Sequence, residues 1–201
     1  MHAPHNIYLV LEYMEHDIHG LIDKKLALDV SQIKCIMMQV LEGVSYIHSQ
    51  NVMHRDIKGA NILVDNKGNI KITDFGLARK FDIRQGVNLT NRVVTLWYRS
   101  PELLLGSEHY TTAVDLWSVG CLFAELLTSK ALFAAGNEVG VLDSIYRKCG
   151  FPTEETWPGV SLLKYYKEMV PSEKYSRTLH DVLKSFPKYG FINCDWDNKV
   201  Y

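Results

Sequence analysis

The 201-residue sequence lacks the features that mark membrane or nucleic-acid-binding proteins. Its 22 basic and 23 acidic residues give a net charge of −1, so charge supplies no reason to expect nucleic acid or an anionic membrane as a direct partner. No apolar run approaches the ~18 residues of a membrane span, and the N-terminus has no signal-peptide pattern. We therefore expect a soluble, intracellular protein.

Cysteine patterns that would indicate a metal site or a disulfide framework are also missing. The four cysteines, Cys35, Cys121, Cys149 and Cys194, are scattered without C-x-x-C spacing. There is no G-x-x-x-x-G-K-[ST] sequence, which argues against a generic phosphate-loop nucleotide-binding module. The composition, 47% hydrophobic and 22% charged, is that of a globular protein with a substantial core.

The most informative stretch runs from His54 to Asn61 and is followed by Asp74-Phe75-Gly76. It reads H-R-D-x-x-x-x-N plus D-F-G, and resembles the catalytic and metal-binding loops of protein kinases. Phosphate transfer from ATP needs a carboxylate to accept the proton of a substrate hydroxyl, and oxygen ligands for Mg²⁺. Asp56 fits the first role, and Asn61 and Asp74 the second. Lys58 would place a cation beside the transferring phosphate.

Local patterns predict the framework around these loops. Apolar residues recur every three or four positions from Asp29 to Gln50, which predicts a helix whose start is fixed by a capping box between Asp29 and Gln32. The runs Ile62–Val64 and Ile70–Thr73 flank a turn-rich segment and predict a hairpin. This hairpin would bring Asn61 and Asp74 to the same end.

A short apolar run from Asn6 to Tyr13 predicts a buried strand. On spacing alone it is simply a core strand. The kinase resemblance implies more, namely that it leads into the hinge, with Leu11 at the back of the pocket and the backbone of Glu12 and Met14 pairing with adenine. By the same resemblance Asp17 lies near the ribose and Leu63 under the adenine.

The segment from Val93 to Glu102 (V-V-T-L-W-Y-R-S-P-E) is similar to the activation segment of cyclin-dependent kinases. The resemblance implies that Thr90 is an activating phosphorylation site whose phosphate is bound by Arg55 and Arg79. It also implies that Thr95 bridges Asp56 and Lys58, and that Val93 and Val94 admit a proline after the target Ser or Thr. On composition alone, Thr90 is an ordinary exposed loop threonine.

Two further helices are predicted. Thr111–Ser129 is apolar almost all round, which is typical of a buried helix, and its Asp115 must be hydrogen-bonded. The resemblance implies that Asp115 supports the backbone at His54 and Arg55, and that Glu102 supports the end of the activation segment. The second helix is Asn137–Cys149. Similarity in E-Y-M-E-H-D-I-H-G-L-I favours the transcriptional cyclin-dependent kinases, which act on the RNA polymerase II tail.

The predicted organisation is a partial protein kinase domain over residues 1–188, comprising hinge and large lobe, with a divergent tail over 189–201. The fold class is α+β and kinase-like, mainly α-helical with a short catalytic-loop hairpin, and the small lobe is expected to be absent. The expected cofactors are ATP and Mg²⁺, the expected partners a cyclin and a substrate with Ser-Pro or Thr-Pro, and the expected location the nucleus, the cytoplasm or both. The alternative is a truncated, inactive kinase lobe that acts as a binding module.

Overall fold

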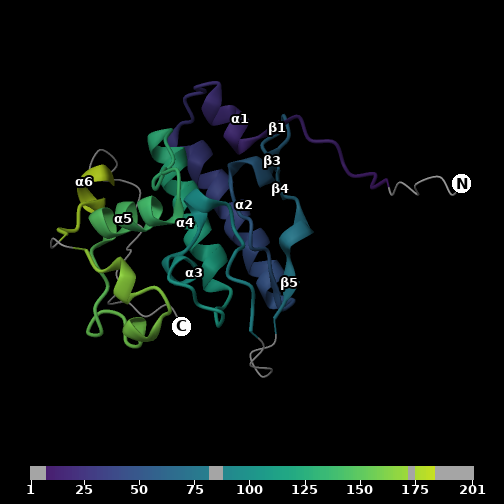
Figure 1. Cartoon of the computed structure of the whole chain (residues 1–201). Coiled ribbons are helices and arrows are strands. Elements are labelled where there is room, and N and C mark those ends of the chain that lie inside the picture. Colours follow the sequence, from purple (N-terminus) through teal and green to yellow (C-terminus); the bar gives the residue numbers. More distant parts are fainter. Residues whose placement is uncertain (1–7, 82–87, 172–174, 184–201) are drawn as a thin grey trace, which may run out of the picture.

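The computed structural model describes residues 8–81, 88–171 and 175–183. Helices are the main regular structure of this part, and two small sheets lie along one side of helix α2 (Figure 1). None of the helices in the described ranges is both long and apolar enough to cross a bilayer.

Helix α2 (Val30–Ser49) packs against both sheets, through β4 in one and β2 in the other. The Asp29 side chain accepts from the backbone N–H of Gln32 at 2.9 Å, and the Gln32 side chain accepts from the backbone N–H of Asp29 at 2.8 Å, so the predicted capping box is confirmed. Most of the predicted apolar stripe is buried, but Leu41 is 47% exposed. It lies outside the face of α2 that packs on α4 and β4. The buried stripe consists of Ile33, Ile36, Met37, Val40 and Val44.

The sheets are small and antiparallel. Strands β1 (His16–Asp17), β3 (Ile62–Val64) and β4 (Ile70–Ile72) form one sheet in the order β1-β3-β4. Ile62 pairs with Ile72, which confirms the predicted hairpin. Strands β2 (Val52–Met53) and β5 (Arg79–Lys80) form the second sheet.

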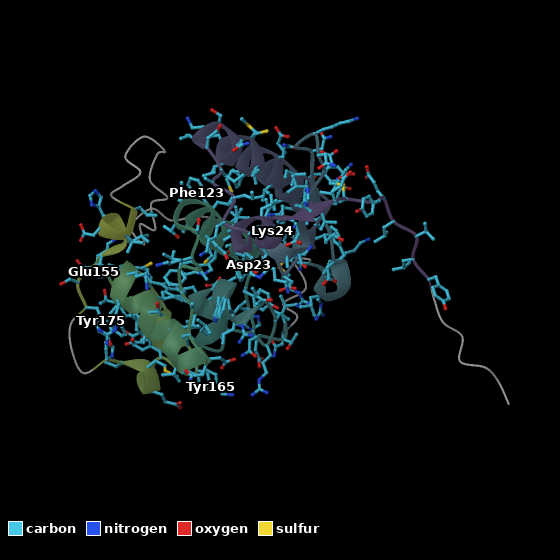
Figure 2. The ribbon with its side chains drawn as sticks, turned by 90° about the horizontal axis from the view of Figure 1, so that it is seen from above. Asp23, Lys24, Phe123, Glu155, Tyr165 and Tyr175 are labelled. Atoms are coloured by element: carbon cyan, nitrogen blue, oxygen red, sulfur yellow. The ribbon has the colours of Figure 1, made fainter. Side chains whose placement is uncertain are left out.

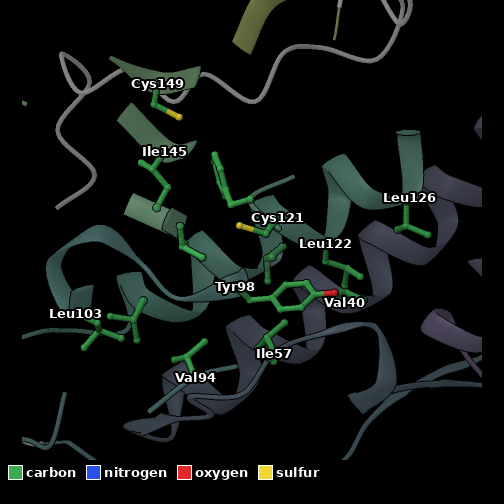
Figure 3. Packing of buried hydrophobic residues seen from close by; sticks show 14 of the residues in the cluster. Val40, Ile57, Val94, Tyr98, Leu103, Cys121, Leu122, Leu126, Ile145 and Cys149 are labelled. Atoms are coloured by element: carbon green, nitrogen blue, oxygen red, sulfur yellow. The ribbon is translucent and has the colours of Figure 1, made fainter. Parts of the chain in front are cut away.

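The core lies between α2 and the helices α3 (Pro101–Leu104), α4 (Ala113–Thr128) and α5 (Glu138–Cys149). Figure 3 shows Tyr98 near Val40, Ile57 and Leu122, where residues from distant parts of the chain meet. The predicted helices at 111–129 and 137–149 are confirmed, although α4 is not buried all round, since Leu116 is 40% exposed.

Shorter elements complete the fold. The described helices also include α1 (Ile18–Asp23), which is capped by the Asp17 side chain, and α6 (Leu179–Leu183). Single 3₁₀ turns occur at Gly59–Asn61, Phe75–Leu77, Leu96–Tyr98, Val160–Leu162 and Lys167–Met169.

The predicted buried strand at Asn6–Tyr13 is wrong where the structure describes it. Residues 8–13 have no regular structure, and their apolar side chains are exposed, Val10 at 97% and Leu11 at 73%. This segment runs away from the helices (Figures 1 and 2). An apolar run forms a strand only when another strand pairs with its backbone, and no described residue does so here. Residues 6 and 7 of this prediction, and the predicted tail 189–201, lie outside the described residues.

Candidate active site

Asp56 lies at the centre of a compact hydrogen-bonded cluster and is only 5% exposed. Its Oδ1 accepts from the Thr95 hydroxyl at 2.7 Å and from the Thr95 backbone N–H at 3.1 Å. Its Oδ2 accepts from Lys58 Nζ at 2.8 Å, and Lys58 also donates to the Thr95 hydroxyl at 3.0 Å. Burial by itself raises the pKa of Asp56, but the bonds from Lys58 and Thr95 outweigh it and hold the pKa below its ordinary value. Asp56 is therefore an ionised, fixed carboxylate at neutral pH.

Asn61 connects this cluster to the hairpin. Its side-chain NH₂ donates to the Asp56 backbone carbonyl at 2.8 Å and to Asp56 Oδ2 at 3.0 Å. The Thr73 N–H donates to the Asn61 carbonyl at 3.0 Å, so Asp74 follows directly beside Asn61. Because the NH₂ group is used by Asp56, Asn61 has its amide oxygen to offer to a cation. An amide oxygen and the exposed Asp74 carboxylate at one hairpin end form a donor set that suits Mg²⁺.

Asp115, near the start of α4, holds the catalytic loop from behind and is completely buried. Its two carboxylate oxygens accept from the backbone N–H groups of His54 and Arg55, each at 2.8 Å. The contact expected for Asp115 is thus present. The sequence reasoning missed a third partner, His48 Nε2, which lies 2.8 Å from Asp115 Oδ2. A histidine at the end of a predicted helix carries no signal of such a contact.

Three non-glycine residues near the Asp56 cluster have left-handed backbone conformations: Arg55 (φ +65°), Asp74 (φ +62°) and Val94 (φ +67°). For the β-branched Val94 this conformation is a genuine outlier, and such strain persists only where surrounding contacts impose it. The His54 side chain, to which the sequence analysis gave no role of its own, contacts the two neighbours of Asp74. Its ring bonds the Thr73 carbonyl at 2.9 Å and packs edge-on against Phe75 at 4.8 Å between ring centres.

The predicted phosphorylation region is partly assembled. Arg55 is buried and donates to the Leu77 carbonyl at 2.8 Å and to the Tyr110 hydroxyl at 3.0 Å. Tyr110 in turn donates to the Thr90 backbone carbonyl at 2.6 Å, while the Thr90 side chain is exposed. Arg79 is exposed and lies in β5, where it pairs with Met53 of β2. Met53 precedes Arg55 by two residues, so Arg55 lies two residues beyond the strand β2 that pairs with β5. Tyr110, which the sequence reasoning missed, connects Arg55 to the Thr90 backbone.

A second cluster fixes the segment after Thr95. Arg99 donates to the Val94 carbonyl through Nε at 3.3 Å and Nη2 at 3.0 Å. The Tyr98 hydroxyl donates to Glu125 on α4 at 2.5 Å; burial, with the Glu125 contact, raises the pKa of Tyr98. The Tyr98–Glu125 contact joins positions 27 apart, and the Arg99–Val94 contact depends on the left-handed backbone at Val94, so the sequence reasoning missed both.

The residues expected on the adenine side fall into two groups, of which only Asp17 and Leu63 lie in paired strands. Glu12 is exposed and pairs with Lys71 at 3.5 Å, and Met14 is half-buried in irregular backbone. Asp17 and Leu63 do meet, since they are opposite one another in β1 and β3. Asp17 also caps α1 through Gly20 N–H at 2.9 Å. The remaining predicted support residue, Glu102, lies on α3, where burial raises the pKa of its carboxyl.

The arrangement defines a class of protein: the chain belongs to the protein kinase domain family, whose model matches residues 1–189. Within that family it belongs to the cyclin-dependent kinases. It is 50% identical over 186 residues to "Cyclin-dependent kinase C-2" of Oryza sativa subsp. japonica, with 92% of this chain and 36% of the relative covered. It is 47% identical over 190 residues to "Cyclin-dependent kinase G-2" of Oryza sativa subsp. indica, with 92% and 26% covered.

Among solved structures, the chain is similar to one described as "Crystal Structure of the yeast RNA Pol II CTD kinase CTDK-1 complex". The TM-score is 0.83 at 44% identity, over 87% of this chain and 58% of that one. The kinase fold inferred from the catalytic-loop motif is therefore confirmed. The chain spans about a third of the length of the two "Cyclin-dependent kinase C-2" relatives, from Oryza sativa subsp. japonica and Arabidopsis thaliana.

Proposed function

We propose that this chain carries the phosphate-transfer centre of a serine/threonine protein kinase of the cyclin-dependent type. The observation that carries the proposal is the Asp56 cluster, in which a buried, ionised carboxylate is held by Lys58 and Thr95. Asp56 would accept the proton of a substrate hydroxyl and orient its oxygen. Lys58, 2.8 Å from Asp56, would stabilise negative charge that develops on the transferred phosphate.

Nucleotide and metal have identifiable places in this proposal. Asn61 and Asp74 would hold Mg²⁺, and the cation when bound would neutralise phosphate charge. Leu63 and Asp17, adjacent across β1 and β3, would lie under the adenine and near the ribose, and the backbone of Glu12 and Met14 would face the adenine.

The conformation of Val94 supports a preference for proline after the target residue. The Val94 carbonyl accepts hydrogen bonds from both Nε and Nη2 of Arg99. It is therefore a poor acceptor for the backbone N–H of the substrate residue that follows the target and would bind against Val93 and Val94. An ordinary residue would then bury its N–H without a partner, at a cost of ~1–3 kcal/mol. Proline has no N–H and avoids this cost.

Regulation and partners follow the same family pattern. Thr90, exposed and joined through Tyr110 to Arg55, would be the activating phosphorylation site, with Arg55 and Arg79 as phosphate ligands. A cyclin is the proposed partner. The similar structure is described as an RNA Pol II CTD kinase, so we propose the C-terminal tail of RNA polymerase II as a substrate and the nucleus as the location.

The test is phosphate transfer by the complete natural protein, isolated with its bound partners, to a peptide with one serine followed by proline. We expect transfer that requires Mg²⁺ and ATP. If the preparation binds Mg-ATP or peptide but transfers no phosphate, the proposal is overturned in favour of the alternative, a kinase lobe that acts only in binding.

A further inference from the structure

Arg99 holds the Val94 carbonyl with one edge of its guanidinium and a carboxylate with the other. Nη1 donates at 2.5 Å to Glu138 Oε1, while Nε and Nη2 face Val94. The Arg99 side chain is 13% exposed and the Glu138 side chain 54% exposed. The ion pair therefore lies at the edge of the structure, with its cation inside and its anion towards solvent.

Glu138 is well placed to keep a fixed position. It is in the first turn of α5, whose N-cap Asn137 accepts from the Gly140 N–H at 2.8 Å. A negative charge is favoured at this end of a helix, so the carboxylate is stabilised there independently of Arg99. Helix α5 is anchored in the core by Val141, Leu142 and Ile145.

The planar guanidinium makes the two contacts interdependent. Its donors have a fixed fork geometry, so the direction of Nη1 determines the direction of Nε and Nη2. Losing the Glu138 carboxylate would free the guanidinium to turn away from Val94. The Val94 carbonyl would then become available to other donors, and the strain at φ +67° would lose one of the contacts that impose it.

We propose that Glu138 is a specificity-determining, positioning residue: through Arg99 it keeps the Val94 carbonyl occupied, and so enforces the requirement for a residue without an N–H after the target Ser or Thr. This inference rests on the proposed kinase function. Glu138 acts through Arg99 and is not placed against the substrate.

The experiment compares three peptides that differ only in the residue after the serine: proline, alanine and N-methylalanine. N-methylalanine lacks the N–H, as proline does, but has no ring. The kinase is the complete protein with its bound partners, as wild type, Glu138→Gln and Glu138→Ala. The matched control is Asp143→Asn, which removes a carboxylate from the same helix where it pairs with Arg147 and Tyr175.

For the wild type and Asp143→Asn we expect similar kcat/KM with proline and N-methylalanine, and a much lower value with alanine. In both Glu138 variants we expect the value for the alanine peptide to rise at least about fivefold relative to proline, because the released Val94 carbonyl can pair with the N–H. An unchanged ratio, or equal losses with all peptides, would overturn the inference while leaving the kinase function in place. No transfer by any form, wild type included, would overturn both.

Discussion

The two sides of the candidate active site differ in how completely their polar groups are paired within this chain. On the catalytic-loop side, Asp56 and Asp115 are buried and accept hydrogen bonds at both carboxylate oxygens. On the adenine side, residues 8–13 are exposed and irregular, and Glu12 makes only a surface ion pair. The comparison teaches that the proposed phosphate-transfer groups are positioned by α4 and the segment after Val93, without contributions from residues 8–13.

The largest effect is expected from removing Asp56, the proposed base on the catalytic-loop side. Asp56→Asn in the complete protein should lower kcat for a Ser-Pro peptide by ~10²–10⁴-fold, the usual contribution of general base catalysis. The affinity for Mg-ATP, measured by calorimetry, should change little, because Asp56 is not among the proposed metal or adenine contacts. A loss of less than about tenfold would show that Asp56 is not the base.

The next largest effect concerns the contribution of Asp115, on the catalytic-loop side, to the stability of the fold. Asp115→Asn replaces one carboxylate oxygen with a donor, so a buried backbone N–H of His54 or Arg55 loses its acceptor. We expect a loss of about 3 kcal/mol in the free energy of unfolding, measured in urea. Asp23→Asn, at an exposed carboxylate paired with His19, is the control and should leave stability unchanged. Equal stability of Asp115→Asn and wild type would contradict the bracing role.

A matched pair of valines contrasts the packed core with the segment at residues 8–13. Val40→Ala on α2 deletes two buried methyl groups at 0% exposure and should cost about 2 kcal/mol. Val10→Ala makes the same chemical change at 97% exposure, and should cost less than about 0.5 kcal/mol. Thermal unfolding measures both. Similar costs would mean that the segment at residues 8–13 is packed in the folded protein.

The smallest expected effect is a shift in acid sensitivity. The folded-state pKa of Asp56 is lowered, so its contribution to stability is present above the ordinary carboxyl pKa of about 3.9 and is lost as pH falls through the folded value. Lys58→Met removes a partner that lowers this pKa. We therefore expect the variant to lose stability at a higher pH than wild type in acid unfolding followed by circular dichroism.

Lys71→Met is the control for this measurement, since Lys71 pairs with the exposed Glu12. Its acid unfolding should match that of the wild type. An unshifted curve for Lys58→Met would show that Lys58 does not stabilise the ionised form of Asp56.

Sequence patterns predicted those parts of the fold that are determined locally. The capping box of α2 and the β3–β4 hairpin depend on residues within a few positions of each other, and both are present. The strand predicted at residues 6–13 is absent from its described part, residues 8–13, because strand formation depends on a pairing partner, which an apolar run does not reveal. The contact between Arg99 and Glu138 was not predicted because α5 brings Glu138 from 39 positions away.

The central claim is that the phosphate-transfer centre is formed in this chain before any nucleotide binds. Amide hydrogen exchange followed by NMR in the absence of ATP tests it most directly. The N–H groups of His54, Arg55 and Thr95, which donate to Asp115 and Asp56, should be strongly protected, whereas those of residues 9–13 should exchange at the rate of an unstructured peptide. Equal, weak protection of both groups would contradict the account.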